Sequence, residues 1–156
     1  MKQAITKEKI LKEEEKSWEK GERDEGVNIP IEHEFAHKHV RSKIYETLKR
    51  LNCNRNSLIL NLGVGSGLDH EYVLQASENV IGVDISKRAL KMFKSKHNEP
   101  VILADVEKLP FKDETFDFVV AIGLLHHLVG QGDLECYINE FKRVTIGGGV
   151  DRGIRA

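Results

Sequence analysis

Hydrophobic and polar positions along residues 57–144 form blocks that predict strands and helices in turn. Short, nearly continuous apolar runs fall at residues 57–61, 80–83, 101–104 and 116–122. The segments that follow predict helices over about 68–75, 87–96 and 133–144, and Ser86 is a natural N-cap for the second of these. Strands that alternate with helices predict right-handed crossovers and a parallel sheet. The apolar character of the runs indicates strands that are covered on both faces.

The first 56 residues follow a different pattern. Residues 2–25 are dominated by Lys and Glu, which predicts a solvated helix or a partly ordered arm. Pro30 opens a second helical stretch to about Leu51, along which apolar residues recur on one face. We therefore expect a helical arm and lid over residues 1–56 and an α/β core over residues 57–156.

Composition narrows the classes of partner. Lys plus Arg number 24 and Asp plus Glu number 25, so the net charge of -1 gives no global attraction to nucleic acid or to an anionic membrane. No apolar run approaches the roughly 20 residues of a membrane-spanning helix. Cys53 and Cys136 lie far apart, which is typical of reduced thiols in a cytoplasmic protein. We expect a cytoplasmic protein without a metal, and neither a membrane nor a nucleic-acid partner.

Three of the predicted strand ends carry groups suited to a nucleoside, and ligands of open parallel sheets bind at such ends. Gly63, Gly65 and Gly67 leave bare backbone after the first strand. Asp84 lies 21 residues after Gly63, close to the spacing of an acid that binds a ribose diol. Asp105 ends the third strand, where its carboxylate can accept from an adenine amine. Each feature alone also suits a tight turn or a helix cap, but their order and spacing together indicate a nucleoside site.

Four segments in register resemble class I S-adenosylmethionine-dependent methyltransferases of the type 11 branch. They are residues 59–67, 80–86, 104–111 and 116–128, which are similar to the glycine motif, the ribose-binding segment, the adenine motif and the fourth strand with its loop. The resemblance implies an α/β, Rossmann-like parallel sheet with helices on both faces. This chain would supply its first four strands after an N-terminal helical segment. The implied function is methyl transfer from S-adenosylmethionine to an unidentified acceptor, which we expect to be a small molecule.

The resemblance also implies a set of cofactor-binding residues. The glycines would run beside the methionine and ribose portions, and Asp84 would hold the ribose diol. Asp105 would face the adenine amine with Val106 beside the ring, and Ile122 and Gly123 would line the floor near the methionyl group. The full set is Asn61, Gly63, Gly65, Gly67, Asp84, Ile85, Asp105, Val106, Ile122 and Gly123.

The sequence departs from the family pattern at two places. Asn61 stands where the glycine motif usually has an acid, so it brings no charge toward the methionyl ammonium and we expect weaker cofactor binding. The usual Leu-Lys-Pro-Gly-Gly turn reads Val-Thr-Ile-Gly-Gly-Gly at residues 144–149, and the sequence given ends seven residues later. Family members continue through three more strands. Strand four would then be a sheet edge, so we expect a homo-oligomer, a partner chain that covers this edge, or marginal stability.

Two pairs of histidines are candidates for chemistry. His126 and His127 follow the fourth strand near the expected methyl donor, where either could act as a general base or orient a nucleophile. The alternative is that they only cap the loop. His33 and His37 match the zinc-protease pattern His-Glu-x-x-His. No clear third ligand follows them, so we favour a polar face of the lid helix and no metal.

Two other functions remain open. A nicotinamide-dependent oxidoreductase should read Gly-x-Gly-x-x-Gly, but here the third glycine comes one residue early, at Gly67, and Leu68 takes its place. The second alternative is a non-catalytic or truncated cofactor-binding subunit. Such a chain would bind S-adenosylmethionine and need another polypeptide to act.

Overall fold

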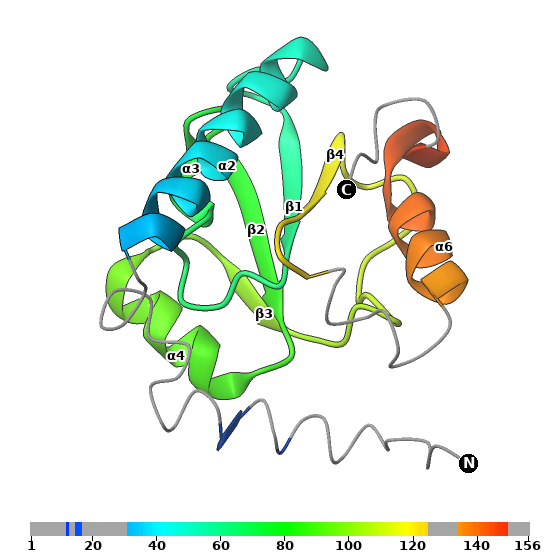
Figure 1. Ribbon diagram of the computed structural model, residues 1–156. Coiled ribbons are helices and arrows are strands. Elements are labelled where there is room, and N and C mark those ends of the chain that lie inside the picture. The colour runs from blue at the N-terminus through cyan, green and yellow to red at the C-terminus, as the bar shows by residue number, and fades with distance from the viewer. Residues whose placement is uncertain (1–11, 13–14, 17–30, 125–133, 150–156) are drawn as a thin grey trace, which may run out of the picture.

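The structure is a computed structural model that describes residues 12, 15, 16, 31–124 and 134–149, and for residues 31–40 it describes only the backbone. Helices and strands alternate along the chain, except that an irregular loop joins the third strand directly to the fourth (Figure 1). In order, the elements are α2 (Ile31–Arg50), β1 (Leu58–Leu62), α3 (His70–Leu74), β2 (Asn79–Asp84), α4 (Lys87–Lys96), β3 (Val101–Leu103), β4 (Phe118–Ala121), α6 (Leu134–Val144) and the 3-10 helix η1 (Ile146–Gly149).

The four strands form one parallel sheet in the order β3-β2-β1-β4. Strand β1 is central, and its Ile59 lies opposite Val80 of β2 and Phe118 of β4. This arrangement confirms the predicted α/β fold with its parallel sheet. Because all strands run the same way, their carboxyl ends lie along one edge, where the predicted nucleoside residues are found.

Helices cover both faces of the sheet, as Figure 1 shows with α2, α3 and α4 on one side and α6 on the other. Successive side chains of a strand point to opposite faces, and both Ile59 and Leu60 are completely buried. Ile59 packs in a cluster with Leu48 of α2 and Val73 of α3. Leu60 packs in a second cluster that includes the apolar side chains of α6, namely Tyr137, Phe141 and Val144. The sheet is therefore the middle layer of three.

The predicted boundaries hold best where a local cap fixes them. Helix α4 begins at the predicted residue because the Ser86 hydroxyl accepts from the Ala89 N–H at 3.1 Å. Helix α3 begins two residues later than predicted, at His70, because a turn comes first: the Gly67 N–H donates to the Val64 carbonyl at 2.9 Å. Among the described helices, none is long and apolar enough to cross a membrane.

Strand β4 pairs with β1 along one side, and no other strand of the described residues pairs with it on the other side. There, the described residues supply one isolated parallel bridge, between Phe116 and Thr145. The Phe116 N–H donates to the Val144 carbonyl and the Ile146 N–H donates to the Phe116 carbonyl, both at 2.9 Å. The chain after α6 thus returns to the sheet beside the segment that leads into β4. Self-association through this edge remains a prediction.

A polar pair is buried beneath the loop that follows β1. The Asn61 side-chain amide lies 3.2 Å from Nδ1 of His70, whose side chain is fully buried. The amide nitrogen is the donor, so Nδ1 accepts and the ring is neutral. The His70 ring also packs edge-on against Phe93, with centroids 4.8 Å apart. Burial lowers the pKa of His70 to about 4; nearby Glu99 opposes this shift, and His97 adds to it.

This buried histidine predicts a loss of stability in mild acid. The pKa of His70 is about 4 when folded and near its ordinary 6.5 when unfolded, so the unfolded chain binds more protons between these values. The free energy of unfolding should therefore fall as the pH falls below 6.5, by about 2 kcal/mol at pH 5. Urea unfolding at pH 8 and pH 5 should show this loss in the wild type.

The matched variant is His70→Gln, which keeps a hydrogen-bonding amide and cannot be protonated in this range. It should be less stable at both pH values but lose about 2 kcal/mol less than the wild type on acidification. Equal losses in the two proteins would contradict the assignment of a neutral, buried His70.

Candidate functional site

Backbone hydrogen bonds join the carboxyl ends of β1, β2 and β3. The N–H groups of Gly63 and Val64 donate to the Val83 carbonyl at 2.8 and 3.2 Å. The Ala104 N–H donates to the Asp84 carbonyl at 3.0 Å. The glycine loop, the end of β2 and the start of the loop after β3 are therefore held side by side, as the sequence predicts for a nucleoside site.

The Asp84 carboxylate is fixed by two backbone donors. Its Oδ2 accepts from the Gly65 N–H at 2.9 Å and its Oδ1 accepts from the Ser86 N–H at 2.8 Å. Ile85, between Asp84 and the N-cap of α4, is half-buried. A carboxylate is an acceptor with about four lone-pair positions, and the hydroxyl groups of a ligand are donors of the kind that it binds. The two backbone bonds hold this carboxylate in place.

The glycine loop packs closely against its neighbours. Gly67 has a φ of 96°, and a Cβ added there would lie 2.4 Å from the ring of His97 at the end of α4. Gly63 has a φ of 67°, and a Cβ there would lie 3.1 Å from the Leu124 side chain. Side chains at these positions would be strained and would push the loop away from α4 and from the segment after β4. The loop therefore needs glycine for its course as well as for any ligand.

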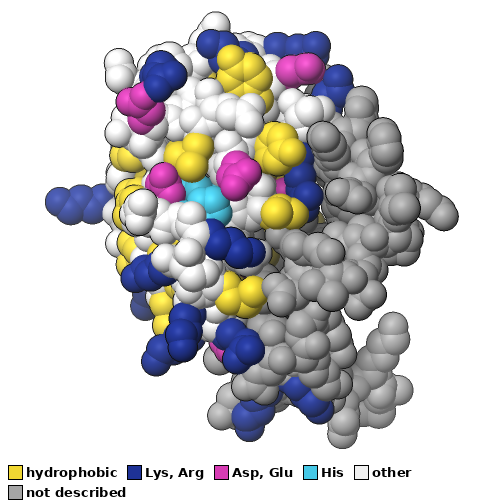
Figure 2. All heavy atoms as spheres, turned by 90° about the vertical axis from the view of Figure 1, so that its left-hand side faces the viewer, with side chains coloured by type: hydrophobic (Ala, Val, Ile, Leu, Met, Phe, Trp, Pro, Cys, Tyr) yellow, Lys and Arg dark blue, Asp and Glu magenta, His cyan; other side chains and the backbone are white. Residues whose placement is uncertain are grey.

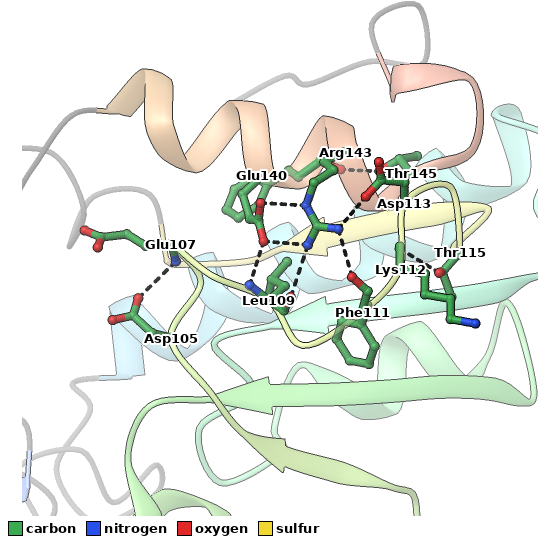
Figure 3. Close-up of polar contacts among 11 residues, drawn as sticks. Asp105, Glu107, Leu109, Phe111, Lys112, Asp113, Thr115, Glu140, Arg143 and Thr145 are labelled. Atoms are coloured by element: carbon green, nitrogen blue, oxygen red, sulfur yellow. Dashed lines mark hydrogen bonds and ion pairs between the residues drawn. The ribbon is translucent and has the colours of Figure 1, made fainter.

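The second carboxylate sits in a tight turn after β3. Oδ1 of Asp105 accepts from the Glu107 N–H at 3.0 Å (Figure 3). The Asp105 carbonyl accepts from the Lys108 N–H at 3.1 Å. The neighbouring Val106 is 8% exposed and packs into the core cluster on the α6 face of the sheet. The buried valine thus anchors a turn whose carboxylate is only partly buried.

The structure gives fewer contacts, or none, for the remaining predicted site residues. Asn61 is 2% exposed and its amide contacts His70 in the core, so a contact with a methionyl group stays a prediction. After β4, Ile122 is half-buried and Gly123 is exposed. His126 and His127 lie outside the described residues, as do the side chains of His33 and His37 in α2. Among the side chains that are described, no group of three or more His, Cys, Asp or Glu could hold a metal ion.

No pattern in the sequence marks a group of residues on α6 that contact the loop after β3, two of which, Glu140 and Arg143, are labelled in Figure 3. They are Tyr137, Glu140 and Arg143. A Glu and an Arg three residues apart on a helix predict only a surface ion pair. Their partners are largely backbone groups of an irregular loop, and no residue type marks such groups in a sequence.

The carboxyl end of the sheet therefore combines a fixed carboxylate, bare glycine backbone and a second carboxylate in the turn after the neighbouring strand. Hydroxyl and amine groups donate to carboxylates, and a flat or extended ligand can approach a backbone that lacks side chains. These are the groups that a ribose and an adenine present. The described geometry suits an adenine nucleoside.

Comparison with known proteins gives the family. Residues 60–150 match the family model described as a methyltransferase domain. An uncharacterised protein of Methanocaldococcus jannaschii is 35% identical over 135 residues, which are 86% of this chain and 56% of that protein. The tRNA (carboxymethyluridine(34)-5-O)-methyltransferase of Arabidopsis thaliana is 37% identical over 94 residues, 60% of this chain and 22% of the plant protein. This chain thus spans about half the length of the first relative and less of the second.

A similar fold is found in a chain from the complex between the Haloferax volcanii Trm112 methyltransferase activator and the putative methyltransferase. The TM-score is 0.64 at 18% identity, over 83% of this chain and 54% of that chain. Such low identity shows the fold alone.

The comparisons settle one alternative and leave one expectation without support. They favour a methyltransferase over a nicotinamide-dependent oxidoreductase. The expectation that nucleic acid is not a partner is left without support, because a relative is named for methylation of a tRNA nucleoside. The family match covers more than half of the chain and contains all four strand ends described above. The chain therefore belongs to the methyltransferase domain family, within its class I, S-adenosylmethionine-dependent group.

Proposed function

We propose that this chain binds S-adenosylmethionine along the carboxyl edge of its sheet and takes part in transfer of the methyl group. The observation that carries the proposal is the Asp84 carboxylate, held between the Gly65 and Ser86 N–H groups beside the bare glycine loop. A ribose diol donates two hydrogen bonds, and a carboxylate is an acceptor suited to such a pair. The residues of the edge therefore fit the cofactor of the family.

The other predicted residues would have separate roles in binding. Gly63, Gly65 and Gly67 let the methionine and ribose portions lie against the backbone. Asp105 accepts from the adenine amine, while the Val106 backbone lies beside the ring. Ile85 follows the ribose-binding acid, and Ile122 and Gly123 line the methionyl end with Asn61 below.

When bound, S-adenosylmethionine supplies an electrophilic methyl group. In its transfer, a lone pair of the acceptor forms a bond to the methyl carbon while the carbon–sulfur bond breaks toward sulfur, and an acceptor N–H or O–H loses its proton. The protein contributes alignment and the exclusion of water. His126 and His127 remain candidates for the base that takes the proton. A chain that binds the cofactor but needs another polypeptide to act remains the alternative.

Replacement of Asp84 tests the cofactor site. Asp84→Ala removes two charge-assisted hydrogen bonds of about 1.5–3 kcal/mol each, so the Kd for S-adenosylmethionine should rise at least about a hundredfold. Isothermal titration measures this directly, with NAD as a second ligand that should not bind. The matched control is Glu78→Ala, which removes an exposed acid just before the amino end of the same strand. Undiminished affinity in Asp84→Ala would rule out the ribose role.

The class of acceptor is a separate part of the proposal. The near-neutral charge of the whole chain led us to expect a small molecule. A specific surface favours RNA as a second candidate, and a plant relative is named for methylation of tRNA.

This surface is helix α4. It carries five basic residues and no acidic residue, and all five are exposed: Lys87, Arg88, Lys91, Lys94 and Lys96. None of the five forms an ion pair with a described residue. Figure 2 views the molecule from the left-hand side of Figure 1, and Lys and Arg side chains gather in the lower part of that view, at the height of α4. Uncompensated cations near the end of β2 suit the phosphates of a nucleic acid better than a small neutral acceptor.

Salt dependence distinguishes the two acceptor classes. Lys87, Lys91 and Lys94 share one helix face over about 10 Å. If they neutralise RNA phosphates, their triple replacement by Ala should weaken binding of a tRNA transcript. It should also flatten the plot of log K against log salt by about 2 units of slope. Fluorescence anisotropy over a range of KCl concentrations measures both.

The control variant has the same change in net charge, but at residues outside α4. Replacement of Lys43, Arg50 and Lys112 by Ala removes three exposed cations from other elements. This control should leave the slope almost unchanged. Equal slopes in the wild type and the α4 variant would remove the RNA candidate and leave the small-molecule acceptor.

A further inference from the structure

We propose that Tyr137, Glu140 and Arg143 of helix α6 are positioning residues of the adenine subsite, which hold the loop after β3 so that Asp105 meets the adenine amine. None of them would touch the cofactor. The inference rests on the proposed function, because it takes Asp105 as the adenine partner. It adds residues from an element that the sequence did not connect with the site.

The loop in question needs support from outside. Residues 104–117 join β3 to β4 and contain no helix and no strand. An irregular loop has no ladder of its own hydrogen bonds to fix its course, and its backbone groups must find other partners. Asp105 lies at the beginning of this loop, so its position depends on what holds the residues that follow.

Arg143 uses every N–H group of its guanidinium, and three of the five hold the middle of the loop. Nη2 donates to the Leu109 carbonyl at 3.1 Å, and Nη1 donates to the Phe111 carbonyl at 2.8 Å and to Asp113 at 2.7 Å (Figure 3). Nε and Nη2 donate to the two carboxylate oxygens of Glu140 at 2.8 and 2.7 Å. An arginine has five such donors in a planar fork and a lysine has only three. The contact is therefore specific to arginine.

Glu140 contacts both Arg143 and the backbone of the loop. The oxygen that accepts from Nη2 of Arg143 also accepts from the Leu109 N–H at 2.7 Å, so Leu109 is held by both its backbone groups. Hydrogen bonds from the Arg143 side chain, opposed by burial and aided by the Leu109 N–H, lower the pKa of Glu140. Glu140 thus stays ionised and keeps the guanidinium aligned with the loop.

Tyr137 extends the contact to the adenine carboxylate itself. Its hydroxyl donates to the Glu107 carboxylate at 2.9 Å, and the Glu107 N–H donates to Oδ1 of Asp105 at 3.0 Å. Glu107 therefore accepts a hydrogen bond from α6 with its side chain and donates one to Asp105 with its backbone. Displacement of Glu107 would turn the carboxylate that is proposed to accept from adenine.

Helix α6 is a firm base for these contacts. Its apolar residues Tyr137, Phe141 and Val144 are buried in the same core cluster as Val106 and Leu109 of the loop. The polar contacts and the core thus fix the loop from the same side of the sheet. Tyr137, Glu140 and Arg143 are spaced three apart, so they follow one side of the helix.

Two ligands that differ only at the purine test this proposal. S-adenosylhomocysteine carries the amine, and S-inosylhomocysteine carries a carbonyl oxygen in its place. The ratio of their Kd values reports whether a carboxylate meets the amine. Isothermal titration of the full chain should give a ratio of at least about ten in favour of the adenosyl ligand, because a charged hydrogen bond is lost. Asp105→Ala should bring this ratio close to one.

Tyr137→Phe and Arg143→Lys should each lower the ratio by about three- to tenfold while the protein still binds the adenosyl ligand. The control is Val73→Ala, a cavity in the core on the other face of the sheet, which should lower the Tm and leave the ratio unchanged. Tyr137→Phe removes one hydroxyl and keeps the buried ring, so it tests the positioning role of α6 even if Arg143→Lys fails to fold.

The two possible failures are distinct. Equal ratios in the wild type and Asp105→Ala would overturn the adenine role of Asp105, and with it this part of the proposed function. A ratio that falls in Asp105→Ala but persists in both α6 variants would overturn the positioning role alone.

Discussion

The hydrogen bonds that Asp84 makes with backbone groups of its neighbours are the contacts on which the rest of the site depends. Its carboxylate accepts from the glycine loop after β1 and from the first turn before α4, and its carbonyl accepts from the residue after β3. One residue thus joins the ends of three strands. Buried or half-buried backbone donors need partners, so the same bonds that close the loops also fix the carboxylate at the carboxyl end of the sheet.

Packing on the two faces of the sheet supports this edge in different ways. On the face of α2, α3 and α4, the buried Asn61–His70 pair adjoins the glycine loop, whose Gly67 carbonyl accepts from the His70 N–H. The rings of His97 and Phe93 leave no room for a side chain at Gly67. On the face of α6, Arg143 and Glu140 hold the loop after β3. The proposed ribose side of the site thus depends on a neutral, buried histidine, while the proposed adenine side depends on an ion pair.

Much of the fold could be predicted because its signals are local. The apolar runs give the strands, Ser86 caps α4 where expected, and the alternation of strands with helices predicts a parallel sheet. The contact between Asn61 and His70 could not be predicted, because it forms only after the glycine loop turns α3 back over β1. The partners of Arg143 could not be predicted for another reason. They include the backbone carbonyl groups of Leu109 and Phe111, and every residue has such a group.

The central claim is that the carboxyl ends of the strands bind the cofactor. Amide chemical-shift mapping by two-dimensional NMR, with S-adenosylhomocysteine added to the full chain, tests it most directly. The largest shifts are expected at Gly65, Ser86 and Glu107, whose N–H groups bond to the two strand-end carboxylates. Shifts centred at the opposite end of the strands, near Ser57 and Glu78, or no shifts at saturating ligand, would contradict it.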